Sequence, residues 1–179
     1  MELSICIVNW NTRQLLAECL ESIETQRDAM QLQTIVVDNG SSDGSAEMVE
    51  REFPEYVVVR SANLGYPHGN NVGFQRATAR YQLMLNPDTL LPPSAVADCI
   101  RYLDAHTDIG VLGPRLVLAD GNLDLACRRS YPTPLNALAK FSGLSRLFPR
   151  SRALASYNLT YLDPNQEADV ESLVGAFML

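Results

Sequence analysis

The stretch "QTIVVDNGSSDGS", residues 33–45, carries the pattern from which the fold of this 179-residue chain is predicted. An apolar run of strand length ends at Asp38. A cluster of asparagine, glycine, serine and aspartate follows, and this composition predicts a turn into a short helix from about Ser45. A strand that passes through a polar turn directly into a helix is typical of parallel sheets covered by helices. We therefore predict an α/β fold.

The same alternation extends outward from this stretch in both directions. Predicted strands cover "LSICIVNW" (3–10), "QTIVVD" (33–38), "YVVVR" (56–60) and "YQLMLN" (81–86). Predicted helices begin after Thr12 as N-cap and at about Ser45, cover about 71–79, and extend from Pro92-Pro93-Ser94 to about His106. In the first helix the apolar residues fall on one face, at Leu15, Leu16, Cys19, Leu20 and Ile23. These elements predict a mostly parallel sheet flanked by helices.

The pattern is less regular after residue 110. The segment "RLVLADGNLDLA" (115–126) predicts a hairpin around the turn Asp120-Gly121. Residues 128–161 predict short helical pieces separated by proline and glycine. The final segment "ADVESLVGAFML" (168–179) predicts a last strand that enters a turn.

Composition predicts one core and an uneven charge. With 46% hydrophobic residues the chain can bury one sizeable core, and its net charge of −7 argues against nucleic-acid binding. Residues 125–162 nevertheless contain six basic residues and no acidic one, which leaves −13 on the remainder. The six are Arg128, Arg129, Lys140, Arg146, Arg150 and Arg152. A local basic surface is therefore expected on an acidic protein.

Cysteine spacing and hydropathy indicate a compartment. The four cysteines, Cys6, Cys19, Cys99 and Cys127, show no zinc or redox spacing, and we interpret them as small buried hydrophobes in a reducing environment. No basic leader precedes a long apolar stretch, and no segment approaches the roughly 18 apolar residues of a membrane span. We expect a cytoplasmic protein, soluble or attached peripherally to a membrane.

Polar residues follow four successive predicted strands. They are Asn9 with Trp10, Asp38, Arg60 with Asn63, and Asn86 with Asp88. The carboxyl ends of parallel strands meet at one edge of the sheet, where α/β proteins bind ligands. We therefore expect a binding site at this edge.

Asp38 is the first candidate in this set. Its carboxylate can accept hydrogen bonds from a base imide or a ribose hydroxyl, and the glycines after it would let the backbone approach a ligand. An ordinary turn and helix cap made from the same residues is the alternative.

The loop from Asn63 to Gly73 is the second candidate. It contains two adjacent amides, Asn70 and Asn71, framed by Gly69 and Gly73. Amide side chains and free N–H groups at a helix start suit a diphosphate or a sugar hydroxyl. A tight loop built from its usual residues is the alternative.

Asp88 is the third candidate. Pro87 removes a backbone donor and fixes its own φ, so the strand ends there and Asn86 and Asp88 are held in a set relation. A carboxylate suits Mg²⁺ or Mn²⁺, and the metal would neutralise charge on a departing diphosphate. A turn that only starts the next helix is the alternative.

Five segments together resemble the family 2 glycosyltransferases of the GT-A fold, and within them the rhamnosyltransferase-like branch. They are "SICIVNWN" (4–11), "VVDNGSSDGS" (36–45), "NLGYPHGNNVGF" (63–74), "YQLMLNPDTLL" (81–91) and "VGAFML" (174–179). They occur in the family's order and cover the chain nearly end to end. The resemblance implies a Rossmann-like GT-A domain over residues 1–179. Residues 1–110 would form the nucleotide-sugar-binding half, and residues 111–179 the start of the acceptor-side half.

The resemblance also implies an activity. It is that of an inverting hexosyltransferase that passes a sugar from a dTDP- or UDP-linked donor to a glycan or lipid-linked acceptor in polysaccharide or cell-wall assembly. The expected donor is dTDP-rhamnose. In the family an acidic stretch after "GAFML" provides the general base, so we expect the base beyond Leu179 and a chain truncated before it.

The family's motifs assign the candidate residues. The position matched by Asp38 contacts the nucleotide base, and Asn86 and Asp88 fall on an Asp-x-Asp element. An amide supplies no negative charge, so we assign Asn86 to a ribose or sugar hydroxyl and Asp88 to the divalent metal. The nucleotide-sugar-binding candidates are Asn9, Asp38, Asn63, Asn70, Asn71, Asn86 and Asp88.

The sequence leaves two alternative functions open and predicts one further interaction surface. A sugar nucleotidyltransferase would have a glycine-rich basic loop where this chain has "NWNTRQ" (9–14), and a non-catalytic nucleotide-sugar-binding module is the other alternative. Residues 128–152 interleave basic with large apolar residues, which suits contact with an anionic membrane or a lipid-diphosphate acceptor. A solvated surface above ordinary core residues is the alternative.

Overall fold

The computed structural model describes residues 1–27 and 30–179, and these form two compact units. The first unit contains residues 1–112 together with 175–179, and the second contains residues 113–174. The last five residues of the chain thus belong with its first half.

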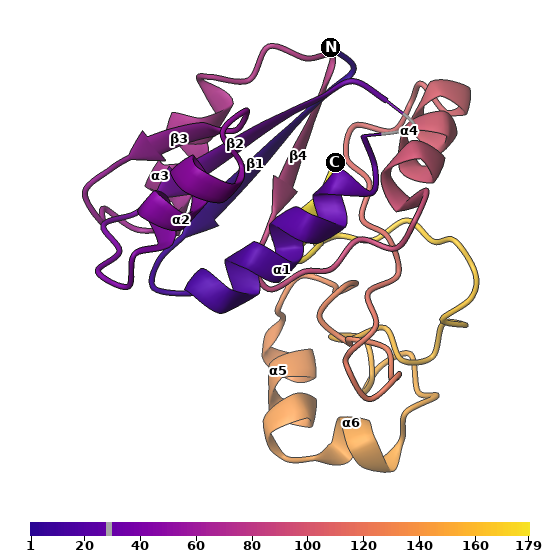
Figure 1. Ribbon diagram of the computed structural model, residues 1–179. Helices are drawn as coiled ribbons and strands as arrows, with labels where there is room; N and C mark the ends of the chain where they lie inside the picture. Colours follow the sequence, from indigo (N-terminus) through magenta and orange to yellow (C-terminus); the bar gives the residue numbers. More distant parts are fainter. Residues whose placement is uncertain (28–29) are drawn as a thin grey trace. The chain divides into compact units, whose positions relative to one another are not determined.

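The first unit is built on a five-stranded sheet (Figure 1). Its strands are β1 (Leu3–Asn9), β2 (Leu32–Asp38), β3 (Val57–Arg60), β4 (Tyr81–Leu85) and β5 (Phe177–Met178), in the order β3-β2-β1-β4-β5. The first four are parallel, and β5 pairs antiparallel with β4. The predicted mostly parallel α/β sheet of the GT-A type is therefore confirmed. The last strand lies after the glycine of "VGAFML" rather than before it.

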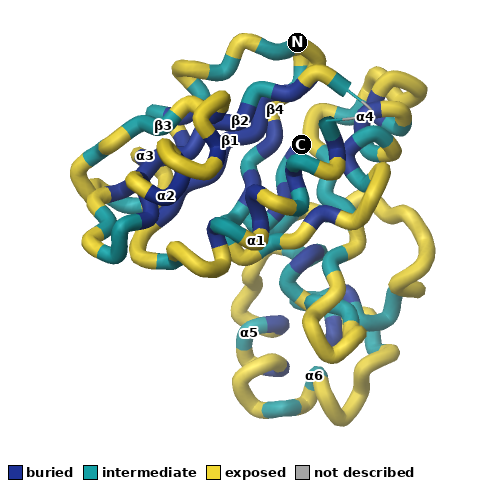
Figure 2. The backbone as a smooth tube through the Cα atoms, viewed as in Figure 1, coloured by how far each residue is buried: buried dark blue, intermediate teal, exposed yellow. Residues whose placement is uncertain are grey.

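Four helices accompany this sheet. They are α1 (Arg13–Glu24), α2 (Ser45–Glu52), α3 (Tyr66–Phe74) and α4 (Ala95–Ala105). The side chains of β1 alternate between two buried faces, so the strand is dark along its whole length in Figure 2. One face carries a cluster of Cys6, Val8, Ile35 and Val37, against which Val72 and Phe74 of α3 pack. The other face of β1 presents Leu3, Ile5 and Ile7, none of which is exposed.

Helix α1 differs from its prediction in two details. Thr12 occupies the N-cap position, but its hydroxyl donates to Asn9 Oδ1 at 2.6 Å and does not cap the helix. Leu16, Cys19, Leu20 and Ile23 are buried as predicted. Leu15, however, is 45% exposed, because it lies at the edge of the apolar stripe.

Helix α3 begins at Tyr66, five residues before the predicted start at about Asn71, and it ends at Phe74 rather than at about residue 79. Gly65 precedes it with φ of 94°, a conformation that glycine adopts without strain, and Pro67 is tolerated because the first turn lacks N–H partners in any case. The predicted loop from Asn63 to Gly73 is therefore mostly helix.

The glycines of α3 have a packing role that the sequence did not reveal. A Cβ atom on Gly73 would lie 2.0 Å from Cys6 Sγ, and one on Gly69 would lie 2.7 Å from Val8 Cγ1. Such distances are far below van der Waals contact. Glycine at both positions therefore lets α3 lie directly on β1.

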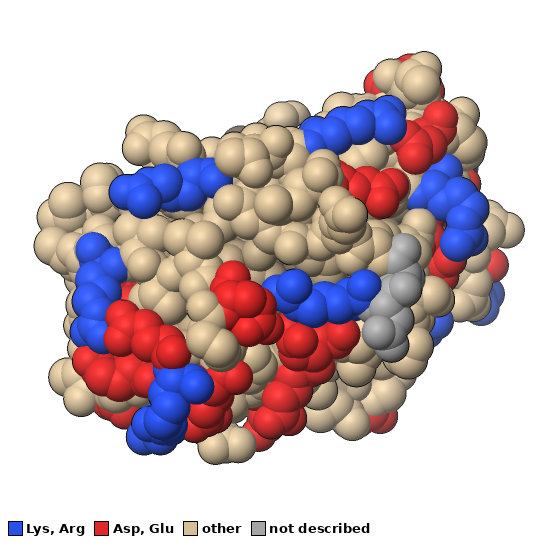
Figure 3. All heavy atoms as spheres, turned by 45° about the horizontal axis from the view of Figure 1, so that its top comes forward, with Lys and Arg blue, Asp and Glu red and all other residues tan. Residues whose placement is uncertain are grey.

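Charged side chains of both signs are interspersed on one face of the molecule (Figure 3). In the first unit Arg60, at the end of β3, bonds Glu47 at 2.8 Å and Glu50 at 2.9 Å. The Arg60 guanidinium is therefore engaged by these carboxylates and does not join the polar groups at the other strand ends.

The second unit has little regular structure. It contains α5 (Pro134–Phe141) and the single turn α6 (Leu144–Leu147), and a bridge joins Arg129 to Ser172. The predicted hairpin around Asp120-Gly121 is reduced to a turn with one bridge, Val117 to Leu123. Gly121 has φ of 83°, as a tight turn requires, yet too few residues pair on either side to form strands.

Candidate functional site

The carboxyl ends of β1 and β2 hold a buried polar cluster. Asn9 is fully buried, and its Nδ2 lies 3.3 Å from Asp38 Oδ1 and 3.1 Å from Ser41 Oγ. The other carboxylate oxygen, Asp38 Oδ2, accepts the Ser41 N–H at 3.1 Å. Asp38 is 4% exposed, so these donors stabilise a carboxylate with little access to water. The cluster fixes the start of the turn that follows β2.

Asp43 fixes the end of the same turn. Its carboxylate accepts the Arg13 N–H at 2.9 Å and the Ser45 N–H at 3.1 Å, and also the Ser45 hydroxyl. Partial desolvation acts to raise the pKa of Asp43, but the hydrogen bonds from Ser45 and Arg13 outweigh it and hold that pKa below its ordinary value. Asp43 thus joins the first turns of α1 and α2.

Asn39 and Asn63 form a second pair at this edge. Asn39 Nδ2 donates to Asn63 Oδ1 at 3.0 Å, and that oxygen also accepts the Gly65 N–H at 3.2 Å. Asn39 is 3% exposed, and its own Oδ1 is buried without a hydrogen-bond partner among the described residues. A buried acceptor without a donor is costly. Sequence reasoning named Asn63 but missed Asn39, although it directly follows Asp38.

The two amides of α3 lie in different environments. Asn70 is 3% exposed, and its Nδ2 donates to Tyr66 O at 3.0 Å, one turn earlier in the helix. The Cys6 thiol lies 4.0 Å from Asn70 Oδ1. Asn71 is exposed. Adjacent positions on a helix point about 100° apart, so this difference follows from the early start of α3.

The end of β4 is tied to the last residues of the chain. The Asn86 N–H donates to Ala176 O at 3.0 Å, and Thr89 Oγ1 donates to the same oxygen at 3.3 Å. The Tyr66 hydroxyl lies 2.8 Å from Asn86 Oδ1 and 3.0 Å from Gly175 O. Sequence reasoning missed Tyr66. Its position at the predicted ligand loop was the available signal.

Asp88 lies in the turn that includes Pro87 and is exposed. Within residues 1–27 and 30–179, no hydrogen bond or ion pair engages its carboxylate. Its charge acts on two neighbours. Burial raises the pKa of the Cys19 thiol to about 12, and the charge of Asp88 adds to this shift. Burial also raises the pKa of Tyr66, again with a contribution from Asp88.

The carboxylate of Asp88 is compatible with a divalent cation that takes its other ligands from water and substrate. Among the described residues, no group of three or more His, Cys, Asp or Glu side chains gathers as metal ligands. Mg²⁺ commonly uses one or two carboxylates and takes its remaining ligands from water and substrate phosphates. Asp88, with an uncommitted carboxylate, meets that requirement with a single charge.

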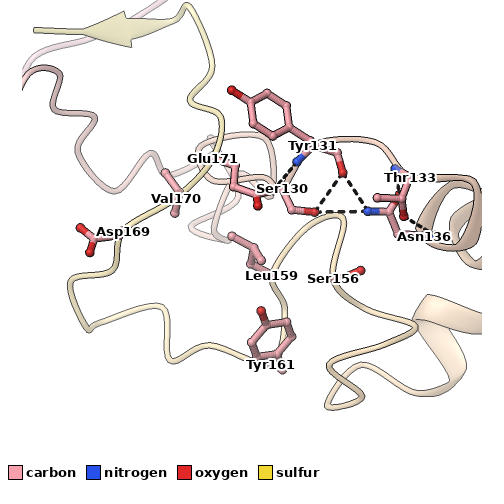
Figure 4. Close-up of a pocket in the computed structure, with 10 residues that line it drawn as sticks. All are labelled: Ser130, Tyr131, Thr133, Asn136, Ser156, Leu159, Tyr161, Asp169, Val170 and Glu171. Carbon is pink, nitrogen blue, oxygen red and sulfur yellow. Dashed lines mark hydrogen bonds between the residues drawn. The ribbon is translucent and has the colours of Figure 1, made fainter.

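The second unit contains a separate pocket of about 360 Å³ (Figure 4). None of the predicted nucleotide-sugar residues lines it. Its polar groups are largely used within the unit: Asn136 Nδ2 donates to Ser130 Oγ at 3.2 Å and to Tyr131 O at 3.0 Å, and Glu171 accepts the Tyr131 N–H at 2.7 Å. These bonds hold the chain segments around the pocket.

The fold and the site place this chain in the class of α/β proteins with an open, mostly parallel sheet. Polar groups lie at the carboxyl ends of the neighbouring strands β2, β1 and β4, the edge at which proteins of this class bind ligands. Residues 4–159 match the family described as glycosyl transferase family 2, which covers most of the chain. The chain belongs to that family.

Curated relatives agree with this assignment. An uncharacterized glycosyltransferase of Nostoc is 25% identical over 126 residues, which cover 68% of this chain and 38% of the relative. The abequosyltransferase RfbV of Salmonella typhimurium is 30% identical over 115 residues, covering 61% of this chain and 34% of the relative. The chain therefore spans little more than a third of either protein.

Solved structures share the fold. TarS of S. aureus in complex with UDP-GlcNAc has a TM-score of 0.60 at 18% identity, over 89% of this chain and 53% of that one. A mannosyltransferase of Pyrobaculum calidifontis in complex with GDP-Man and Mn²⁺ has a TM-score of 0.59 at 24% identity, over 65% of this chain and 36% of that one. At these identities the likeness concerns the fold.

Proposed function

We propose that the first unit binds a nucleotide-diphosphate sugar at the carboxyl edge of its sheet. It is the donor-binding part of a glycosyltransferase that transfers the sugar with inversion. The observation that carries this proposal is that β2, β1 and β4 are neighbours: β2 ends at Asp38, β1 ends at Asn9, and Asn86-Pro87-Asp88 directly follow β4. The nucleotide sugars bound by structural neighbours support it.

Each residue has a proposed role. Asp38, oriented by Asn9, accepts from the base or ribose, and the buried acceptor Asn39 Oδ1 can take a further ligand hydroxyl or N–H. Asn63 and Asn71 contact the sugar or diphosphate. Asn70, which is buried in α3, supports this site through its hydrogen bond to Tyr66 O in the first turn of the helix. Asn86 takes a ribose or sugar hydroxyl. Asp88 holds Mg²⁺ or Mn²⁺.

The chemistry is a displacement at the anomeric carbon. The acceptor oxygen forms a bond to that carbon while the bond to the diphosphate oxygen breaks, and the acceptor proton passes to a base that we do not assign within this chain. A divalent cation held at Asp88 would supply positive charge to the leaving diphosphate. The residues around it bind and orient the donor. The donor that we propose is dTDP-rhamnose, within polysaccharide or cell-wall assembly.

Calorimetric titration tests the site. UDP, dTDP and GDP are titrated with and without Mn²⁺ into the chain and into the variants Asp88→Asn and Asp108→Asn. We expect Mn²⁺ to strengthen nucleotide binding to the chain and to the control variant at exposed Asp108, and to have no effect on Asp88→Asn. Absence of nucleotide binding would contradict the site. Equal metal dependence in Asp88→Asn would contradict the assignment of the metal to Asp88.

We also propose that the second unit meets an anionic membrane surface, at the inner face of the plasma membrane, where a lipid-linked acceptor would lie. Among the described residues, no helix is long and apolar enough to cross a bilayer. Large apolar side chains are nevertheless exposed on and beside α5 and α6, a stretch drawn mostly as exposed in Figure 2. The exposed fractions are Phe141 88%, Leu147 70%, Leu138 65%, Leu135 58% and Phe148 50%.

Basic residues accompany these apolar ones. Lys140 lies 3.9 Å above the ring of Tyr157, and Arg152 lies 5.8 Å from the ring of Tyr161. Arg146 and Arg150 have no polar partner within the described part of the chain. Apolar side chains that enter the headgroup region, beside cations that attract anionic lipid, are the two components of interfacial binding.

Co-sedimentation with vesicles tests this surface. The expected result is binding to vesicles that contain phosphatidylglycerol and much weaker binding to phosphatidylcholine alone. The paired variant Phe141→Ser with Leu147→Ser should lose binding, whereas the control Leu64→Ser, at a residue 67% exposed in the first unit, should retain it. Binding that is indifferent to lipid charge and to Arg146→Glu with Arg150→Glu would refute membrane contact through this segment.

A further inference from the structure

Tyr66 connects three segments that are distant in sequence. It is the first residue of α3, and its hydroxyl reaches Asn86, which follows β4, and Gly175, which precedes β5. The Asn86 main chain is already fixed, because its N–H donates to Ala176 O at 3.0 Å and its carbonyl accepts the Thr89 N–H at 3.2 Å. In the described part of the chain, Tyr66 is the only side chain bonded to the Asn86 amide group. Tyr66 therefore contacts one end of that amide.

The hydroxyl carries one proton but faces two oxygens, Asn86 Oδ1 at 2.8 Å and Gly175 O at 3.0 Å. It can donate fully to only one of them at a time. When it donates to Asn86 Oδ1, the Asn86 NH₂ group is the free end of the amide. When it donates to Gly175 O, its lone pairs can accept from the NH₂ group of an amide turned by 180°, and Asn86 Oδ1 is then the free end.

The two arrangements differ in what they can bind. A free NH₂ group is a donor and repels a cation, whereas a free carbonyl oxygen is an acceptor that a hydroxyl or a divalent cation can use. The carboxylate of Asp88, two residues further on, has no hydrogen-bond or ion-pair partner among residues 1–27 and 30–179. Its negative charge favours a cation beside it. A free amide oxygen would complement that cation.

We propose that Tyr66 is a positioning residue that sets which end of the Asn86 amide is presented to the ligand. With metal and nucleoside diphosphate bound, Tyr66 donates to Gly175 O and accepts from Asn86 Nδ2, so that Asn86 Oδ1 is presented beside Asp88. This inference rests on the proposed nucleotide and metal site. It explains how an amide can act at a position where its oxygen must face the ligand. A carboxylate there would need no such orientation, because its two oxygens are equivalent.

A double-mutant cycle tests this role, with calorimetric titration, in the presence and absence of Mn²⁺, of whichever of dTDP, UDP and GDP binds the wild-type chain most tightly. Tyr66→Phe removes the hydroxyl and should weaken Mn²⁺-dependent binding about three- to ten-fold, the range of one net hydrogen bond. Metal-free binding should not change. A carboxylate has two equivalent oxygens, so in the Asn86→Asp background the same Tyr66→Phe change should cost less than about two-fold.

The matched control is Tyr81→Phe. It also removes a tyrosine hydroxyl bond, here to Asp104 at 2.7 Å, but Tyr81 is the first residue of β4, at the opposite end of that strand from Asn86. It should leave binding unchanged. If the wild-type chain binds none of dTDP, UDP and GDP with Mn²⁺, the proposed function itself fails. If the wild-type chain binds but Tyr66→Phe binds with the same affinity, the positioning role alone is refuted. The same holds if Tyr66→Phe loses as much affinity in the Asn86→Asp background, or in the absence of metal, as it does in the wild-type background with Mn²⁺.

Discussion

Replacing Gly73 with alanine distinguishes a packing role from a ligand-binding role for the glycines of α3. The new Cβ would lie 2.0 Å from Cys6 Sγ and 3.3 Å from Val37 Cγ2. Both neighbours are fully buried, so the sulfur has no open space into which it can turn. The helix can relieve this overlap only by moving away from β1.

The magnitude follows from two opposing effects. Overpacking of a buried contact costs about 1–3 kcal/mol. Alanine in place of glycine inside a helix stabilises that helix by up to about 1 kcal/mol. We therefore expect Gly73→Ala to lower the free energy of unfolding by about 1–2 kcal/mol, measured by urea denaturation.

Two variants sharpen this measurement. Gly110→Ala is the control, because a Cβ there meets no atom within 4 Å, and its stability should match wild type. Cys6→Ala removes the sulfur, so the double variant Cys6→Ala with Gly73→Ala should be more stable than the sum of the single effects predicts. Unchanged stability of Gly73→Ala, with weakened nucleotide binding instead, would refute the packing argument and indicate a ligand contact at this glycine.

Two further predictions concern the polar turn and the buried thiols. Asp43→Ala should lower the free energy of unfolding by about 1 kcal/mol, because it removes the acceptor at the first turns of α1 and α2; the exposed Asp108→Ala should change it by less than about 0.5 kcal/mol in the same denaturation assay. Burial raises the pKa of Cys6 and Cys19 to about 12 from 9.0, so these thiols stay protonated in the folded chain at a pH where the unfolded chain ionises. Stability should therefore be unaffected by them below pH 9 and fall as the pH rises from 9 towards 12. Cys19→Ala should flatten this decline in denaturation series at pH 8, 9 and 10, and an unchanged slope would contradict it.

Local patterns were sufficient for the four parallel strands of the sheet, but not for the position of β5. The apolar runs before Asp38 and Asn86 predicted parallel strands, and the polar residues after them lie at the carboxyl edge of the sheet, because strand direction alone determines where such residues emerge. The hairpin around Asp120-Gly121 was wrong in extent, since a turn signal predicts the turn and not the pairing on either side.

Local sequence patterns predict how the four parallel strands alternate with helices along the chain, and with that the edge that bears Asn9, Asp38, Asn86 and Asp88. Periodicity and turn composition act over a few neighbouring residues and are readable there. The tertiary structure alone decided that Gly73 lies against Cys6 and that Tyr66 bonds a carbonyl 109 positions away. Such contacts depend on how closely packed elements approach one another, which no local pattern encodes.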